Sequence, residues 1–256
     1  MKAVNKRSAG VCYLITCEHG GNKVPAEYRL LFKGRQALLH SHRGWDPGAL
    51  RLARELARRV DGKLIYSTTS RLLVDLNRSL HHSRLFSEVT RPLGRIEKEK
   101  IVNGYYRPYR EEVERYIRQR IKKGKIVIHF SAHSFTPRLR GITRDGDIGL
   151  LYDPSRPSEK KFCDHLQKEL RRELGGLRVR KNYPYHGSAD GLTTYLRKVF
   201  PDNHYLGIEL ELNQRLANGE KKRRPVPAVR LAEAIGKTLE NRAKNARQAF
   251  NPAKNQ

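Results

Sequence analysis

The chain has 256 residues and carries 53 Lys and Arg against 26 Asp and Glu, so its formal net charge is +27. Hydrophobic residues make up 38% of the sequence, which is enough to bury a core, so the charge does not exclude a folded domain. No apolar run approaches the roughly 18 residues that a membrane-spanning helix needs, and residues 1–10 lack the apolar segment of a secretory signal.

The cysteine content indicates the cellular compartment, and the distribution of linker-like segments indicates the number of domains. Cys12, Cys17 and Cys163 are an odd and sparse set, which argues against a disulfide framework and fits a reducing compartment. We therefore expect a cytoplasmic protein without a membrane partner. No linker rich in Gly, Ser or Pro divides the sequence, so we expect one α/β domain over residues 1–256, with a frayed basic tail from about residue 247.

In the first half of the chain, short apolar segments alternate with helical patterns. Apolar residues at helical spacing predict a helix over residues 50–60 that ends at Asp61-Gly62. Apolar and aromatic residues from 101 to 117 mark one face of a long helix, which Gly124 closes. The strands predicted in this half are residues 11–16, 63–67 and 72–75.

The second half continues the alternation, which is typical of an α/β fold. The dense basic run at residues 221–224 precedes Pro225 and is predicted to lie in a loop. The strands predicted here are residues 126–131, 148–152, 177–181 and 205–212, and the helices are residues 158–174, 192–200 and 226–246.

Polar residues suited to chemistry lie at the ends of several predicted strands. In open α/β sheets, ligands bind outside the carboxyl ends of the strands, so we expect these side chains to converge. Two imidazoles and a carboxylate with one open position form the usual ligand set of a catalytic zinc ion, and a further carboxylate can take a proton from water. The residues concerned are Glu18, His19, Arg71, Asp75, His133, Glu209 and Glu211.

Six longer motifs carry most of the polar residues of interest. They are CEHGGNKVP (17–25), HRGWDPGA (42–49), SRLLVDLNR (70–78), AHSFTP (132–137), NYPYHG (182–187) and GIELELNQ (207–214). These motifs resemble those of the N-formylglutamate amidohydrolase family. They occur in the order found in that family and span about residues 11–216. The resemblance implies a metal-dependent amidase with a mixed central sheet between helices, similar to the zinc carboxypeptidases and aspartoacylases.

The resemblance also implies a metal centre and a general base. By their positions in the motifs, His19, Asp46 and His133 are implied as ligands of one divalent ion, which we expect to be Zn²⁺. Glu18 competes with Asp46 as the carboxylate ligand, and it ranks lower because other members of the family have a non-ligating residue before the histidine. Glu211 matches the carboxylate near the end of the last conserved strand and is the implied general base.

Other motif residues are implied to hold the substrate. Asn77 and Arg78 resemble the Asn-Arg doublet with which carboxypeptidase-like enzymes hold a carboxylate, for which the guanidinium fork is suited. Arg71 is implied to assist or to polarise the scissile carbonyl. Asp75 is predicted to anchor Arg78 or another arginine, because a buried carboxylate needs a partner. The remaining implied substrate-binding residues are Asn182 and Tyr185.

Two pairs of residues keep alternative interpretations. Glu209 and Glu211 lie two residues apart on a predicted strand and therefore share a face. If both face the cleft, Glu209 orients a ligand or raises the pKa of its neighbour, and otherwise the pair lies on a solvated strand face. Tyr106 and Tyr109 belong to a segment similar to one in the family, but their spacing favours the buried face of the long helix.

The sequence therefore predicts a hydrolase that cleaves the amide bond of an N-acyl acidic amino acid, N-formyl compounds included, or of a related small amide. The high positive charge leaves an alternative from another class, a protein that binds nucleic acid or other polyanions non-specifically on an amidohydrolase fold that has lost catalysis. The sequence lacks a helix-turn-helix, zinc-finger or RNA-binding signature, and this weighs against the alternative.

Overall fold

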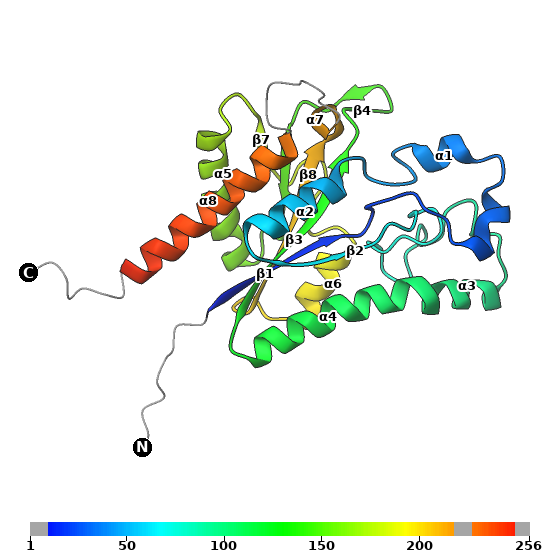
Figure 1. Ribbon diagram of the computed structural model, residues 1–256, viewed down its shortest axis with the longest axis horizontal. Coiled ribbons are helices and arrows are strands. Elements are labelled where there is room, and N and C mark those ends of the chain that lie inside the picture. The colour runs from blue at the N-terminus through cyan, green and yellow to red at the C-terminus, as the bar shows by residue number, and fades with distance from the viewer. Residues whose placement is uncertain (1–9, 218–226, 249–256) are drawn as a thin grey trace, which may run out of the picture.

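A six-stranded mixed sheet lies at the centre of the chain (Figure 1). The structure is a computed structural model that describes residues 10–217 and 227–248, and the side chains of residues 10–216 and 228–240. The strands of the sheet are β1 (Val11–Cys17), β2 (Lys63–Tyr66), β3 (Ile126–Phe135), β6 (Ile148–Leu151), β7 (Val179–Lys181) and β8 (Tyr205–Asn213). A separate hairpin pairs β4 (Arg138–Leu139) with β5 (Ile142–Thr143).

The strands follow the order β2-β1-β3-β8-β6-β7. The first four are parallel to one another, β6 is antiparallel to β8, and β7 is parallel to β6. Because four neighbouring strands run in the same direction, their carboxyl ends lie at one edge of the sheet. The mixed sheet predicted from the sequence is confirmed.

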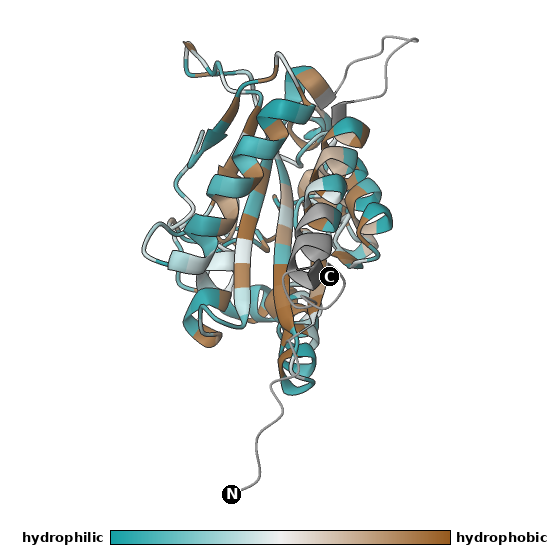
Figure 2. Cartoon of the chain, turned by 90° about the vertical axis from the view of Figure 1, so that its left-hand side faces the viewer, coloured by the Kyte–Doolittle hydropathy of each residue, from teal (hydrophilic) through white to brown (hydrophobic). Residues whose placement is uncertain are grey.

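Helices cover both faces of this sheet. They are η1 (Ala26–Phe32), α1 (Gln36–His40), α2 (Ala49–Arg59), α3 (Arg95–Ile101), the π-helical η2 (Val102–Tyr106), α4 (Arg107–Lys122), α5 (Pro157–Glu173), α6 (Leu192–Val199), α7 (Gln214–Ala217) and α8 (Pro227–Gln248). The helices α2, α5 and α8 pack on one face, and α3, α4 and α6 pack on the other (Figure 1). Apolar residues concentrate on the strands, while the outer surfaces of the helices are mostly hydrophilic (Figure 2).

The two faces of β3 and β8 differ in polarity, because side chains alternate along a strand. One face is apolar and packs against α2, α5 and α8. Its members on these two strands are Ile128, Phe130, Ala132, Leu206, Ile208, Leu210 and Leu212. The intervening residues give the opposite face buried polar groups, which are His129, Ser131, His133, Glu209 and Glu211. This polar face carries the candidate site.

The predicted strand at residues 72–75 is wrong. Leu72 and Leu73 lie in a turn, Val74 and Asp75 have no regular secondary structure, and backbone groups of this segment bond to a later loop instead of to a strand. The hydroxyl of Ser87 donates to the carbonyl of Leu72, and the amide of Asp75 donates to the carbonyl of Leu85. The apolar side chains are nevertheless buried, and a short buried apolar run does not by itself distinguish a strand from a turn.

Two helical predictions also need comment. The long helix begins earlier than predicted, at Arg95, and its π-helical turn inserts one residue, so that Tyr106 is buried and Tyr105 is only partly buried. The last helix, predicted over 226–246, is observed over Pro227–Gln248. The basic run at 221–224 and the part of the predicted tail beyond residue 248 lie outside the described residues. Within residues 10–217 and 227–248, no helix combines the length and the apolar character that crossing a bilayer requires.

His129 is a fully buried imidazole on the polar face of β3. The hydroxyl oxygens of Thr16 and Tyr205 lie 2.8 Å from its Nε2 and Nδ1 atoms, respectively. Burial lowers the pKa of His129 to about 4, because the charged imidazolium would lose its hydration. The folded protein therefore holds this side chain neutral.

His129 is expected to make the fold sensitive to acid. Below the usual histidine pKa of about 6.5 the unfolded chain binds a proton that the native state does not bind until about pH 4, so the free energy of unfolding falls as the pH falls. Between pH 7 and 4.5, His129 accounts for about 2 kcal/mol of this loss. Urea unfolding of the wild type and of His129→Gln at both pH values measures this contribution. If the free energy of unfolding falls equally in the two proteins, His129 is not its source.

Candidate metal and catalytic site

A cleft of about 310 Å³ opens at the carboxyl ends of β1, β3 and β8. The side chains that line it come from segments far apart in the sequence. Among them are the following residues predicted from the motifs: His19, Asp46, Arg71, Asn77, Arg78, His133, Tyr185, Glu209 and Glu211.

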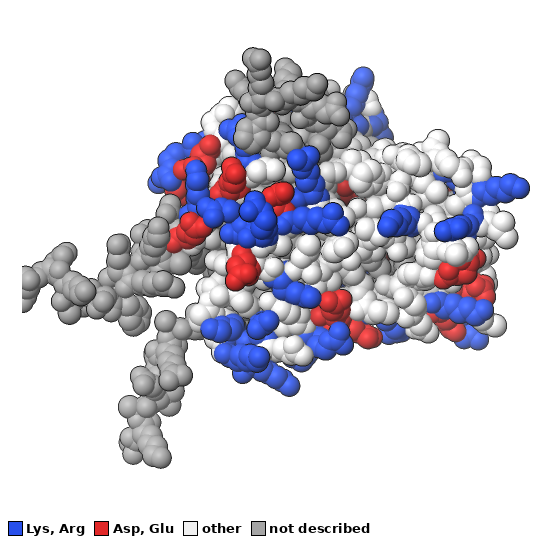
Figure 3. Space-filling view, viewed as in Figure 1, with Lys and Arg blue, Asp and Glu red and all other residues white. Residues whose placement is uncertain are grey.

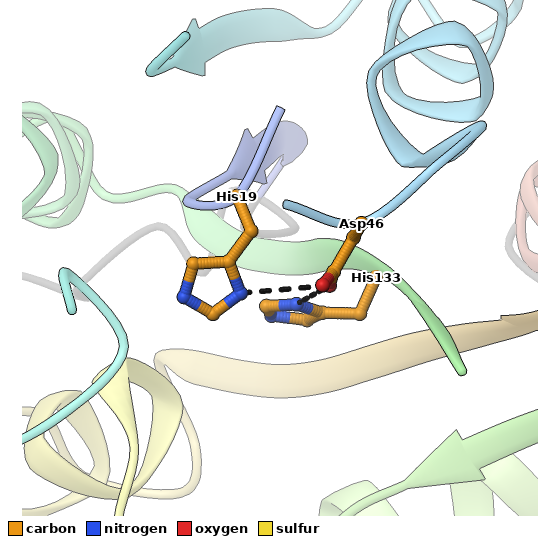
Figure 4. A group of neighbouring side chains, drawn as sticks. All are labelled: His19, Asp46 and His133. Carbon is orange, nitrogen blue, oxygen red and sulfur yellow. Dashed lines mark hydrogen bonds and ion pairs between the residues drawn. The ribbon is translucent and has the colours of Figure 1, made fainter. Parts of the chain in front are cut away.

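Three buried side chains in this cleft are suited to hold a metal ion (Figure 4). His19 follows β1, Asp46 precedes α2 and His133 lies within β3, and one donor atom from each lies within 4.8 Å of the other two. The Nδ1 atoms of His19 and His133 lie 3.5 and 2.9 Å from Oδ2 of Asp46. The two nitrogens and the carboxylate oxygen therefore face one small volume.

Local backbone geometry brings these residues together. The amide of Asp46 donates to the carbonyl of His19, with an N–O distance of 2.9 Å. Gly48 has a φ of 84°, and this left-handed conformation lets the chain turn from Asp46 into α2. Gly21 lies so close to Thr68 that a Cβ atom would be 2.6 Å from its carbonyl oxygen, so the loop after His19 requires a residue without a side chain.

The hydrogen bonds of His19 leave one ring nitrogen for a cation. Its Nε2 lies 2.7 Å from Oδ1 of Asp75, whereas its buried Nδ1 has no hydrogen-bond partner among the described residues. When Nε2–H donates to Asp75, Nδ1 keeps a lone pair that faces the Asp46 carboxylate. Two electron-rich atoms at this separation need a positive charge between them, so the donor set fits a divalent ion.

The charges around the two imidazoles support the same conclusion. Burial lowers the pKa of His133, but the carboxylates of Asp46 and Glu18 outweigh burial and raise it well above the usual value. Burial and Arg71 likewise lower the pKa of His19, and Asp75 and Asp46 reverse the shift. The carboxylates thus create a site that favours positive charge, which a proton or a metal ion can supply.

Asp75 contacts both a candidate ligand and an arginine. Besides His19, its carboxylate accepts from Nη2 of Arg71 at 2.7 Å and from the amide of Asn77 at 3.0 Å. The arginine partner in the structure is thus Arg71, and Arg78 does not contact this carboxylate. Arg71 also forms an ion pair with Asp46 at 3.4 Å, so its guanidinium lines the cleft while it bridges two carboxylates.

Glu211 lies beside His133 because the two residues are partners in the β3–β8 register. Glu209 is the partner of Ser131 and accepts a hydrogen bond from the hydroxyl of Thr193. Both carboxylates line the cleft. Burial raises the pKa of Glu211 to about 7, the nearby carboxylates of Asp46 and Glu209 add to the shift, and Oε2 of Glu211 has no hydrogen-bond partner among the described residues.

The predicted substrate-binding residues do not all reach the cleft. Nη1 of Arg78 donates to the carbonyl of Asp190 at 2.9 Å, and Oδ1 of Asn77 accepts from the amide of Leu192 at 2.7 Å. Tyr185 is exposed at the cleft. Asn182 is not among the residues that line the cleft, and its Oδ1 instead accepts from the backbone amides of Tyr152 and Gly187.

A family model described as N-formylglutamate amidohydrolase matches residues 11–217. The chain belongs to this family. A search of the curated proteins finds no match. The family places the chain among the hydrolases, in agreement with the reaction class predicted from the motifs.

Two solved structures, the first two named here, share this fold. The gene product Atu2144 from Agrobacterium tumefaciens is 29% identical, with a TM-score of 0.77 over 92% of this chain and 93% of that one. An N-formylglutamate amidohydrolase from Ralstonia eutropha JMP134 is 18% identical, with a TM-score of 0.65 over 95% and 96%. A metallo-carboxypeptidase from Pseudomonas aeruginosa aligns more distantly, at 12% identity and a TM-score of 0.41 over 93% and 58%.

Sequence reasoning missed part of the environment of this amidohydrolase-family site. Glu18, weighed as a metal ligand, lies on the Nε2 side of His133, away from the atoms that face Asp46. Ser131 and Tyr109 both donate to the Glu18 carboxylate. The alternation along β3 places Ser131 on the same face as His133, but the contact of Tyr109 depends on how α4 packs and has no signal in the sequence.

Substitution of the candidate ligands is expected to abolish metal binding. Wild-type protein incubated with zinc and then dialysed should retain one ion per chain, and His19→Ala or His133→Ala should retain almost none, because two donors hold zinc much more weakly than three. Elemental analysis measures the content. His165→Ala, which removes an exposed imidazole on α5, is the control and should retain the full amount. Full zinc content in His19→Ala would contradict the assignment.

Proposed function

We propose that this chain is a zinc-dependent amidohydrolase that cleaves the amide bond of N-acyl amino acids, with N-formyl acidic amino acids as the preferred substrates. The observation that carries the proposal is the combination of a two-histidine, one-carboxylate set with a buried glutamate on the adjacent strand, in a single cleft. Membership of the amidohydrolase family supports the same reaction class.

The donor set favours zinc over magnesium or calcium. Imidazole nitrogens suit zinc, whereas the harder cations prefer oxygen ligands. His19, Asp46 and His133 would hold the ion and leave a position open. When bound, zinc supplies a Lewis acid that polarises a carbonyl and makes water more acidic.

Glu211 is the group in the cleft best suited to move the proton. Its pKa of about 7 lets it accept a proton from water near neutral pH and then deliver that proton to the departing amine nitrogen. The unbonded Oε2 is free for this purpose. Because His133 is the register partner of Glu211, this carboxylate lies beside the residues that would hold the ion.

Positive groups in the cleft favour a substrate with carboxylates. Arg78 and Arg84 line the cleft, and the guanidinium group of Arg78 has only the backbone carbonyl of Asp190 as its hydrogen-bond partner among the described residues. A guanidinium binds a carboxylate through two parallel hydrogen bonds. Hydrogen bonds of Asn77 and Arg78 to the segment 190–192 hold this wall of the cleft in place.

The high net charge adds long-range attraction for such anions. On the face drawn in Figure 3, Lys and Arg side chains are spread over the surface with acidic side chains among them. Charge alone motivates the polyanion-binding alternative, and we do not propose it as a second function.

Replacement of the general base should slow turnover without loss of metal. Glu211→Gln keeps the shape of the side chain but cannot accept the proton, so kcat should fall by roughly 10²–10⁴-fold while zinc content stays at the wild-type level. Steady-state kinetics and elemental analysis on the same preparation measure both. Glu111→Gln, an exposed change on α4, is the control. A wild-type kcat in Glu211→Gln would remove this residue from the mechanism.

A panel of amides tests the substrate class. The zinc-loaded protein should hydrolyse N-formylglutamate and N-formylaspartate with a higher kcat/KM than N-formylleucine, because the last lacks a side-chain carboxylate. Arg78→Lys should raise KM for the acidic substrates roughly tenfold, since one ammonium does not reproduce the guanidinium fork. Arg91→Lys, outside the cleft, should leave KM unchanged. If the zinc-loaded protein hydrolyses none of the N-formyl and N-acetyl amino acids in the panel, the proposed activity is refuted.

A further inference from the structure

Glu18 is a carboxylate with no exposed surface, and three donors converge on it. The hydroxyl of Tyr109 donates to Oε1 at 2.9 Å, and the hydroxyl of Ser131 donates to Oε2 at 2.6 Å. Nε2 of His133 lies 3.1 Å from Oε2. These donors come from α4 and β3, so Glu18 is held by two elements besides its own segment after β1.

The arrangement selects one tautomer of His133. An ionised carboxylate only accepts hydrogen bonds, so Glu18 favours a proton on Nε2, and Asp46 favours one on Nδ1. When a metal ion takes the place of the proton on Nδ1, the remaining ring proton is the one on Nε2 that donates to Glu18. The proton of Ser131 is directed to Glu18, so this hydroxyl does not compete by donating to Nε2. The Nδ1 atom, 2.9 Å from Asp46, is then left with its lone pair on the side of the candidate metal site.

The His133 imidazole is also the main ionisable partner of the Glu18 carboxylate. Among the described residues no lysine or arginine forms an ion pair with Glu18, and its other two donors are neutral hydroxyls. Asp75, which plays the corresponding part for His19, shares its charge with Arg71. The negative charge of Glu18 is therefore available to make the His133 ring a stronger electron donor.

We propose that Glu18 is a positioning residue that fixes His133 in its metal-binding tautomer and thereby sets the affinity of the site for zinc. The proposal rests on the metal-dependent function argued above. In this proposal Glu18 contacts the ligand His133 and does not itself bind the metal, in contrast to the ligand role considered from the sequence.

The test compares zinc dissociation constants of the full-length chain, measured by competition with a chromophoric chelator. Glu18→Gln is almost isosteric, but its amide can present N–H groups to Nε2, which favours the tautomer with the proton on Nδ1. We expect zinc to bind about 10–100-fold more weakly to this variant. Tyr109→Phe, which keeps the carboxylate and removes one of its donors, should weaken binding less.

A control separates this effect from the general loss of a carboxylate that accepts from a tyrosine. Glu114 also accepts from a tyrosine, the hydroxyl of Tyr195 at 2.7 Å, but lies outside the cleft. Glu114→Gln should bind zinc as the wild type does. Thermal unfolding of each metal-free variant shows that the compared proteins are folded. An unchanged zinc affinity in folded Glu18→Gln would overturn the proposal.

A measurement on the wild type decides the matter even where Glu18→Gln fails to fold. Long-range ¹H–¹⁵N correlation spectra of the zinc-loaded protein report which ring nitrogen of His133 carries the proton. Protonation at Nε2 is expected, and protonation at Nδ1 would overturn the proposal.

The outcome is separable from that of the proposed activity. A wild type that binds zinc through His133 and hydrolyses none of the amides would refute the substrate class and leave the role of Glu18 intact. A wild type that binds no zinc would overturn both.

Discussion

The excess of buried negative charge around two imidazoles is the constraint on which the site depends. Glu18, Asp46 and Asp75 are all buried, and the full positive charge that contacts them directly is that of Arg71. Burying unpaired carboxylates is costly, so these groups persist only with compensating positive charge. A divalent ion between His19, Asp46 and His133 would supply that charge at the point where the donor atoms already lie close together.

The fold creates this constraint through strand alternation. One face of β3 and β8 packs an apolar core under α2, α5 and α8, and the other face carries the polar groups toward the cleft. Parallel pairing then sets His133 beside Glu211 and Ser131 beside Glu209. The same pattern that stabilises the sheet therefore brings a candidate ligand and a candidate base to neighbouring positions.

Much of this arrangement could be predicted from the sequence, because it depends on local patterns. The strands at β1, β3 and β8 and the common face of Glu209 and Glu211 follow from alternation and apolar runs. The predicted strand at 72–75 failed because its apolar residues are buried in a turn whose backbone partners lie in a distant loop. The prediction was correct about the burial of these residues and wrong about their pairing in a strand.

The partners of the buried carboxylates could not be predicted, because they depend on how segments far apart in the sequence pack. Asp75 needed a cationic partner, but only the folded chain shows that it holds both Arg71 and His19. The π-helical turn at Val102–Tyr106 changes which side chains of the long helix are buried, and Tyr109, expected in the core, is buried with its hydroxyl on Glu18. These contacts depend on packing, whereas the candidate ligands were implied by the resemblance of the motifs to those of the family.

X-ray absorption at the zinc edge of the zinc-loaded wild type tests the central claim most directly. We expect a first shell of light atoms only, with two imidazole nitrogens at about 2.0–2.1 Å and carboxylate and water oxygens at similar distances. The multiple scattering typical of histidine should disappear in part when one of the two imidazoles is removed. A shell with sulfur, or a shell without imidazole scattering, would contradict the claim that His19, Asp46 and His133 form the metal centre.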